Sequence, residues 1–266
     1  MQPLNIQHAR KIINKKLLSI ARKNLDSNVL IGVAGCVASG KSRLSQNVRS
    51  MASTIFKKEP LYLPFDLWIN IKGLQSPTYA DRFFLDDFIY AVQCIAAGEQ
   101  FFIPRYDLIK KGKLNLIVNK KQKIVWNGKL FLDRLCETDV SPPPGTIGLF
   151  IEEKTGNPYS LFPAVSKNVF LVDGTLIFPV VASDKFDLKI FVQADWPLRI
   201  SRMIRRFNRK EVFGLTTQTL SEYVGFLVDE AKMCADAEIF EQLNDEMILV
   251  ESGPETLSNY LDLRFF

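Results

Sequence analysis

The most constraining feature of this sequence is the run Gly35-Cys-Val-Ala-Ser-Gly-Lys-Ser42, which matches the pattern Gly-x-x-x-x-Gly-Lys-Ser/Thr. An apolar run at 29–34 precedes it, and a helix-compatible stretch at 43–54 follows it. A glycine-rich bend between a strand and a helix can wrap a phosphate chain with backbone N–H groups, and the helix directs its positive dipole end toward the anion. The context therefore predicts a phosphate-binding loop, whereas the pattern alone could also arise as a chance glycine-rich turn.

The residue types in this loop suit a nucleotide polyphosphate together with Mg²⁺. We expect Lys41 to reach the β- and γ-phosphates and Ser42 to hold Mg²⁺ through its hydroxyl, so the predicted cofactors are ATP and Mg²⁺. The residues predicted to bind the nucleotide here are Gly35, Ala38, Ser39, Gly40, Lys41 and Ser42.

Composition limits the remaining classes of function. The 266 residues are 47% hydrophobic, enough for one large α/β domain with insertions, and the net charge of +5 is only mildly basic. A protein that binds polyphosphate needs an excess of Lys and Arg, so we expect no nucleic-acid partner. No apolar run approaches the ~18–20 residues of a membrane span, and the first residues lack the apolar core of a signal peptide.

Cysteine and histidine usage argues against a metal or disulfide framework. Cys36, Cys94, Cys136 and Cys234 form no Cys-x-x-Cys pair, and His8 is the single histidine. Reduced thiols are typical of cytosolic proteins, so we expect a cytoplasmic location.

Apolar runs alternate with helix-compatible segments along the chain. The expected strands are 29–34, 61–64, 168–172, 188–192 and 247–250. The expected helices are 6–24, 43–54, 79–97, 197–209 and 218–233. This alternation predicts an α/β fold, a five-stranded parallel sheet with helices on both faces.

The domain organisation follows from the same pattern. Residues 1–28 are expected to form an N-terminal basic helix, and 29–266 one domain. Residues 108–167 are the least regular part, with short β-prone runs, an Asn127-Gly128 turn and a Ser-Pro-Pro-Pro-Gly break at 141–145. We interpret 108–167 as a small, mostly β insertion over the mouth of the active site.

Further segments, taken in order, resemble the superfamily of P-loop small-molecule kinases that includes uridine kinase, phosphoribulokinase and pantothenate kinase. The resemblance runs from about residue 29 to 251, apart from the insertion. It rests on the loop and on LPFDLWI (63–69), SPTYAD (76–81), IPRYD (103–107), VFLVDG (169–174), FDLKIFV (186–192) and the arginine run at 199–206. It implies a P-loop NTPase fold and ATP-dependent transfer of the γ-phosphate to a hydroxyl of a small molecule, as in uridine kinase.

Two acidic residues are the candidate catalytic carboxylates. Asp66 follows the second strand, where a carboxylate can accept the proton of the attacking hydroxyl, and the family position favours this role over capping of the next segment. Asp173 ends an apolar strand in the manner of a Walker-B acid and is expected to help bind Mg²⁺. The family usually has Glu at this place, and a turn-forming Asp-Gly pair is the alternative.

A run of arginines is the third candidate constellation. Arg199, Arg202, Arg206 and Arg209 recur at helical spacing, and Arg205 neighbours them. The planar guanidinium suits phosphate oxygens. The resemblance implies a lid helix in which Arg202 and Arg205 offset charge on the transferring phosphoryl group and Arg206 contacts the nucleotide. A solvated basic helix is the alternative.

The acceptor segment departs from the family pattern. Nucleoside kinases of this superfamily have an Asp-His pair where Gln75 and Ser76 stand here, and an aromatic pair where Trp68 and Ile69 stand. The resemblance leaves Trp68, Gln75 and Tyr106 as the candidate substrate-binding residues. The acceptor stays open between uridine or cytidine, pantothenate, glycerate, a sugar phosphate and another compound.

Two other classes of function remain to be weighed. A switch or motor NTPase is disfavoured because no Asn-Lys-x-Asp motif occurs, and residues 119–122 read NKKQ. A non-catalytic or regulatory nucleotide-binding protein derived from the kinases is the main alternative, although Lys41, Ser42, Asp66 and Asp173 are retained. A homo-oligomer is also left open.

Overall fold

The computed structural model describes the backbone of 4–23, 26–70, 73, 76, 79–105, 121–126, 129–134, 147–152, 157–175, 177–180, 183–208, 225 and 247–253. The chain forms two compact units. The first comprises residues 1–24, 31–60 and 171–266. The second comprises residues 25–30 and 61–170. Each unit is described below by itself.

The predicted α/β fold with a five-stranded parallel sheet is confirmed. The strand order is β10-β9-β1-β8-β2. The strands are β1 (Val29–Gly35), β2 (Leu61–Pro64), β8 (Val169–Gly174), β9 (Leu188–Gln193) and β10 (Ile248–Glu251). β1 pairs with β9 in parallel from Ile31 opposite Leu188 to Gly35 opposite Val192, and β10 pairs with β9 in parallel as well. All five strands expected from the sequence are present.

The central strands are continuous apolar runs because both of their faces are covered. Every residue of β1 and β8 is buried, and five of the six residues of β9 are buried. Strands of a parallel sheet that are covered on both sides read as unbroken hydrophobic segments instead of alternating ones. This is why their positions could be read from the sequence.

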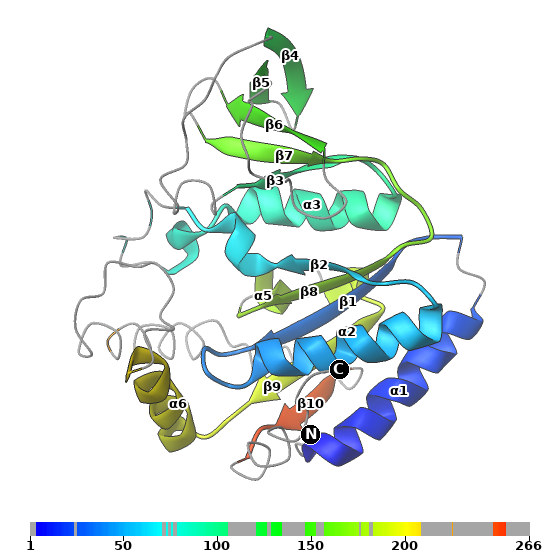
Figure 1. Ribbon diagram of the computed structural model, residues 1–266, viewed down its shortest axis with the longest axis vertical. Helices are drawn as coiled ribbons and strands as arrows, with labels where there is room; N and C mark the ends of the chain where they lie inside the picture. Colours follow the sequence, from blue (N-terminus) through cyan, green and yellow to red (C-terminus); the bar gives the residue numbers. More distant parts are fainter. Residues whose placement is uncertain are drawn as a thin grey trace. The chain divides into compact units, whose positions relative to one another are not determined.

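In the described part of the first unit, the helices are α1 (Ile6–Arg22), α2 (Lys41–Phe56), α5 (Ile177–Val180) and α6 (Trp196–Asn208), with a 3₁₀ turn η4 (Ser183–Lys185). α1 packs beside α2 and β10 (Figure 1) and buries Ala9, Ile13 and Leu17. Just before α1, Leu4 forms a parallel bridge with Val250 of β10. The predicted N-terminal helix is therefore part of the packed first unit, while the domain boundary expected after residue 28 stays a prediction.

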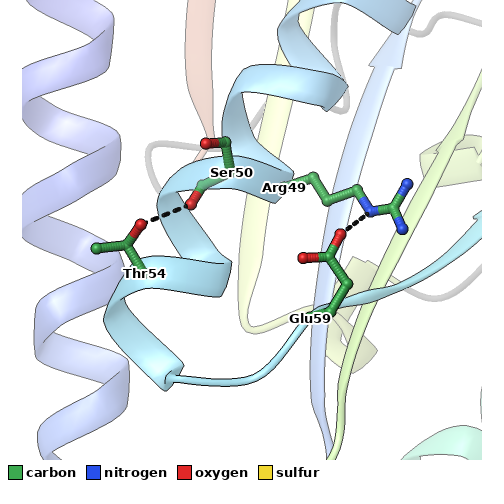
Figure 2. Close-up of polar contacts among 4 residues, drawn as sticks. All are labelled: Arg49, Ser50, Thr54 and Glu59. Atoms are coloured by element: carbon green, nitrogen blue, oxygen red, sulfur yellow. Dashed lines mark hydrogen bonds and ion pairs between the residues drawn. The ribbon is translucent and has the colours of Figure 1, made fainter. Parts of the chain in front are cut away.

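The C-terminal half of α2 carries local polar contacts, which Figure 2 shows. The Thr54 hydroxyl donates to the Ser50 carbonyl at 3.1 Å, and Arg49 Nε lies 2.7 Å from Glu59 Oε1 in the segment after the helix. The side chains of Arg49 and Glu59 are 39% and 61% exposed, so this ion pair contributes no more than about 1 kcal/mol to stability.

The second unit contains an antiparallel sheet of strand order β3-β7-β6-β5-β4. Its strands are β3 (Phe101–Pro104), β4 (Lys121–Trp126), β5 (Lys129–Arg134), β6 (Ile147–Glu152) and β7 (Pro158–Phe162). Four of them fall within 108–167, so the described residues of this segment are mostly β, as expected, while its status as an insertion stays a prediction. Its placement over the mouth of the active site stays a prediction.

The rest of the second unit differs from the sequence expectation at one helix. A helix was expected over 79–97, but a 3₁₀ turn η3 (Tyr79–Arg82) comes first and α3 (Leu85–Ala97) begins later. Between them Phe83 bridges Ile69, and the Phe84 N–H donates to the Trp68 carbonyl at 2.7 Å. This backbone pairing to the segment after the 3₁₀ turn η1 (Phe65–Trp68) breaks the helix.

Several expected elements lie outside the described residues: the helix at 218–233 apart from residue 225, the β-prone run at 114–119, the turn at 127–128 and the break at 141–145. Among the helices that the structure describes, none has the length and apolar character to cross a membrane.

Candidate functional site

The loop between β1 and α2 takes a backbone path that requires glycine at both ends. Gly35 has φ 154° and Gly40 has φ 102°, values that side chains rarely tolerate. A Cβ on Gly35 would lie 2.4 Å from the Val192 carbonyl oxygen, and one on Gly40 would lie 3.0 Å from Ser252 Oγ. A clash with backbone therefore explains Gly35, and the positive φ explains Gly40.

Ala38, midway through the loop, is in the left-handed region without being glycine. Its φ is 62°, a conformation that costs about 1–3 kcal/mol and persists only where surrounding contacts hold it. Ala38 is 6% exposed and packs against Met203 of α6, which is fully buried, with Val37 and Ile200 beside them. The loop thus rests on the apolar side of α6.

The start of α2 leaves donors for an anion. The Ser39 N–H donates to the Cys36 carbonyl at 3.1 Å, while the first intrahelical bonds run from Arg43 and Leu44 to the Gly40 carbonyl at 3.2 and 3.1 Å. The N–H groups of the first turn have no acceptor within their own helix. Lys41 is half-buried and Ser42 is exposed, so both side chains can meet a ligand at the helix start.

Two arginines of α6 donate hydrogen bonds to the backbone carbonyls of the loop. Arg199 Nε donates to the Val37 carbonyl at 2.9 Å. Arg202 Nη1 donates to the carbonyls of Ala38 and Ser39, both at 2.9 Å, and its Nη2 donates to Ser252 Oγ at 2.8 Å. The spacing showed that the arginines share a helix face, but not that this face meets the loop carbonyls. The predicted catalytic role of Arg202 is not tested by these contacts.

The structure describes less of the remaining arginines of the run at 199–209. Arg205 is exposed on α6. The side chain of Arg206 and all of Arg209 lie outside the part of the chain that the structure describes. Their predicted contacts with phosphate stay predictions.

Asp173 lies at the carboxyl end of β8 and is 4% exposed. β8 is the neighbour of β1 in the sheet, so Asp173 follows the same carboxyl edge at which Gly35 opens the loop. Carboxylate and hydroxyl oxygens are the ligands that Mg²⁺ takes from proteins beside substrate phosphates. Asp173 and Ser42 therefore carry the ligand types that the predicted magnesium site requires, and the site itself stays a prediction. Among the described residues, no group of three or more His, Cys, Asp or Glu gathers.

Asp66, the candidate base, belongs to the second unit. It lies in η1, two residues beyond the end of β2, and its side chain is exposed. Its carbonyl accepts the Ile69 N–H at 3.4 Å, which closes the 3₁₀ turn. Asp66 thus lies just beyond the strand expected at 61–64, and its catalytic role stays a prediction.

Of the three candidate substrate-binding residues, the structure describes Trp68. Trp68 is 1% exposed and packs edge-on against Phe88, with ring centroids 5.1 Å apart. Its Nε1 is buried and has no hydrogen-bond partner within the described part of the chain. Trp68 is thus a core residue of the second unit here, and its stacking on an acceptor stays a prediction. Gln75 and Tyr106 lie outside the described residues.

A buried polar cluster in the second unit was not expected from the sequence. The Tyr159 hydroxyl donates to Asp87 Oδ2 at 3.5 Å, and Arg105 Nη1 donates to Ser160 Oγ at 3.1 Å. All four residues are at most 2% exposed. Burial, together with the charges of Asp87 and Glu152, raises the pKa of Tyr159 far above its ordinary value, which keeps the hydroxyl protonated. The bonded partners are 72 and 55 positions apart in sequence and form no local motif.

Comparison with known proteins locates the chain by fold. No protein-family model matches it, and no curated protein matches it. Among solved structures, it is similar to the "putative fructose transport system kinase" of Silicibacter sp. TM1040, with 13% identity, 91% of this chain and 98% of that chain covered, and a TM-score of 0.51.

Two further solved structures align at lower scores. A "possible uridine kinase" from Bacillus stearothermophilus has 12% identity, coverage of 91% and 99%, and a TM-score of 0.44. A "putative P-loop containing kinase with a circular permutation" from Saccharomyces cerevisiae has 10% identity, coverage of 92% and 99%, and a TM-score of 0.48. With the loop geometry above, the likeness to the Silicibacter protein shows that this chain has the fold of P-loop kinases.

Proposed function

We propose that this protein is an ATP-dependent kinase that transfers the γ-phosphate to a hydroxyl of a small-molecule acceptor. One observation carries the proposal: the loop at 35–42 is built at two glycine-only positions and leads from a buried strand directly into the first turn of α2. A loop of this geometry binds a polyphosphate, and the fold is that of P-loop kinases.

Residue roles follow from the chemistry of phosphoryl transfer. The loop N–H groups and Lys41 hold the β- and γ-phosphates, and Ser42 and Asp173 would hold Mg²⁺, which neutralises phosphate charge when bound. Asp66 accepts the proton of the acceptor hydroxyl. The hydroxyl oxygen bonds to the γ-phosphorus as the bond between the γ-phosphorus and the ADP oxygen breaks. The resemblance implies that Arg202 and Arg205 offset charge on the phosphoryl oxygens and that Arg206 contacts the nucleotide.

The acceptor is a small molecule with a hydroxyl group, bound with the help of Trp68, Gln75 and Tyr106. Uridine and cytidine are the first acceptors to test because of the resemblance to uridine kinase. Pantothenate, glycerate and sugar phosphates follow, and the name of the Silicibacter protein adds fructose to the panel. The four cysteines form no Cys-x-x-Cys pair, and reduced thiols are typical of cytosolic proteins, so we expect this ATP-using enzyme in the cytoplasm.

The test is ADP formation from MgATP with this panel, for the unmodified protein and for Lys41→Ala. We expect one acceptor to stimulate turnover and Lys41→Ala to abolish it, because the γ-phosphate loses its charged partner. Intact ATP binding with no stimulation by any acceptor would contradict the kinase and favour a regulatory nucleotide-binding protein.

A further inference from the structure

We propose that Arg199 and Arg202 are positioning residues that assemble the phosphate-binding loop before nucleotide arrives. This inference rests on the proposed function, because it concerns the same loop. It gives these arginines a role that differs from contact with the transferring phosphoryl group, since it works through the loop backbone and needs no ligand.

The contacts that carry the inference are four hydrogen bonds from two guanidinium groups. Three of them go to consecutive loop carbonyls, those of Val37, Ala38 and Ser39, and the fourth goes to Ser252 Oγ, each at 2.8–2.9 Å. Charged donors make hydrogen bonds about twice as strong as neutral ones. Arg199 is 6% exposed and also lies over the Trp196 ring, 5.1 Å from its centroid.

The directions of these three carbonyls also fix the directions of the N–H groups that follow them in the loop. In a planar trans peptide the C=O of one residue and the N–H of the next point in opposite directions, and the described residues contain no cis peptide. Carbonyls of Val37 and Ser39 that point to α6 therefore direct the N–H groups of Ala38 and Gly40 away from α6. In this proposal, a phosphate binds on the side of the loop to which those two donors point.

The same two arginines offset a conformational cost at the centre of the loop. Ala38 is left-handed at φ 62°, and without outside contacts it would relax toward a commoner conformation. Arg202 holds its carbonyl, and Met203, the next residue of α6, packs on the side chain. Ser252 completes the support, because its N–H donates to Gln193 of β9 at 2.9 Å while its Oγ accepts from Arg202.

The experiment compares Arg202→Lys, Arg199→Lys and the double variant with the unmodified full-length protein. Lysine keeps the charge but cannot span several acceptors with a planar fork. Arg22→Lys is the matched control, since Arg22 is exposed in the last turn of α1. Hydrogen exchange of amides 37–42 is measured without nucleotide, MgADP affinity by calorimetry, and KM for ATP against kcat in turnover.

We expect faster exchange confined to 37–42, an unchanged melting temperature within a few degrees, and MgADP binding weaker by at least ~10-fold for Arg202→Lys, the scale of one lost charge-assisted hydrogen bond. KM for ATP should rise by more than kcat falls. Ser252→Ala removes one acceptor of Arg202 and leaves both arginines. It should speed exchange at 37–42 and weaken MgADP binding, each by less than Arg202→Lys does. If an arginine variant does not fold, Ser252→Ala tests whether these contacts order the loop.

Unchanged exchange and MgADP affinity with a reduced kcat would overturn the inference and return Arg202 to the phosphoryl group. No change in any readout would overturn it as well. If the unmodified protein binds no MgADP, the proposed function fails, but the exchange comparison still decides whether the arginines order the loop.

Discussion

At the scale of single residues, backbone geometry explains the residue type at two positions of the loop, and it does not explain the residue type at a third. A side chain is disfavoured at Gly35 by the Val192 carbonyl oxygen and at Gly40 by its φ of 102°. Ser39 is different, because its side chain is fully buried and Oγ has no hydrogen-bond partner within the described part of the chain. A buried hydroxyl without a hydrogen-bond partner costs free energy, so the Ser39 side chain lowers the free energy of unfolding.

Replacing Ser39 by Ala should therefore stabilise the nucleotide-free protein, by about 1 kcal/mol or more in urea unfolding, since the unpaired hydroxyl is removed. Ser45→Ala is the matched control: Ser45 is equally buried, but its hydroxyl donates to the Lys41 carbonyl at 3.1 Å. Ser45→Ala should give no such gain. A loss of stability in Ser39→Ala would show that the hydroxyl has a partner in solution.

Asp66 provides the residue-scale test of the chemistry. Asp66→Asn should lower kcat by at least ~10²-fold, the scale for loss of a general base, with MgADP affinity unchanged. Asp86→Asn is the control, since Asp86 is an exposed carboxylate in the first turn of α3. If Asp66→Asn turns over like the unmodified enzyme, Asp66 is not the base.

At the scale of elements, the sequence predicted best where a segment is apolar throughout. The five strands of the parallel sheet and helices α1, α2 and α6 were found because burial on both sheet faces, or on one helix face, leaves a pattern in the sequence. The prediction of one helix from residue 79 was wrong at Phe83 and Phe84, because backbone pairing of these residues with Ile69 and Trp68 overrides the helical pattern of apolar residues. The loop contacts of Arg199 and Arg202 were missed because they join residues 162–164 positions apart.

α1 supplies a stability prediction at this scale. Ile13→Ala or Leu17→Ala should destabilise the protein by about 2–5 kcal/mol, because both side chains are fully buried where α1 packs beside α2 and β10. Leu18→Ala, at a site 39% exposed on the same helix, should change stability by no more than about 0.5 kcal/mol. Equal effects at Leu17 and Leu18 in urea unfolding would contradict this packing.

The contact between β7 and α3 supplies a pH prediction. Because the pKa of Tyr159 is raised in the folded state, the folded protein keeps this proton while the unfolded chain releases it above its ordinary pKa of 10.0. Stability from this group is complete below pH 10 and falls above it, by up to about 1.4 kcal/mol per pH unit. Urea unfolding at pH 9 to 11 should show this slope, and Tyr159→Phe should lessen it. An unchanged slope in the variant would assign the loss to other groups.

At the scale of the whole molecule, the fold alone does not determine the reaction. The structural likeness to the Silicibacter protein extends over 91% of this chain and establishes the fold. The sequence identity is only 13%, so the acceptor is left undetermined. What can be stated from the chain itself is the arrangement at one sheet edge: a glycine-bounded loop that α6 supports, the start of α2, and Asp173 at the end of the neighbouring strand. This arrangement is the basis on which a triphosphate is expected to bind.

The most direct measurement is calorimetric titration of MgADP into the unmodified protein and into Lys41→Ala and Gly40→Val, with Leu18→Ala as the folded control. We predict saturable one-site binding to the unmodified protein and to Leu18→Ala, weakened by at least ~10-fold in Lys41→Ala and absent in Gly40→Val, whose side chain cannot fit at φ 102°. Binding of equal strength in all four proteins would contradict the account, because the nucleotide would then lie somewhere other than this loop.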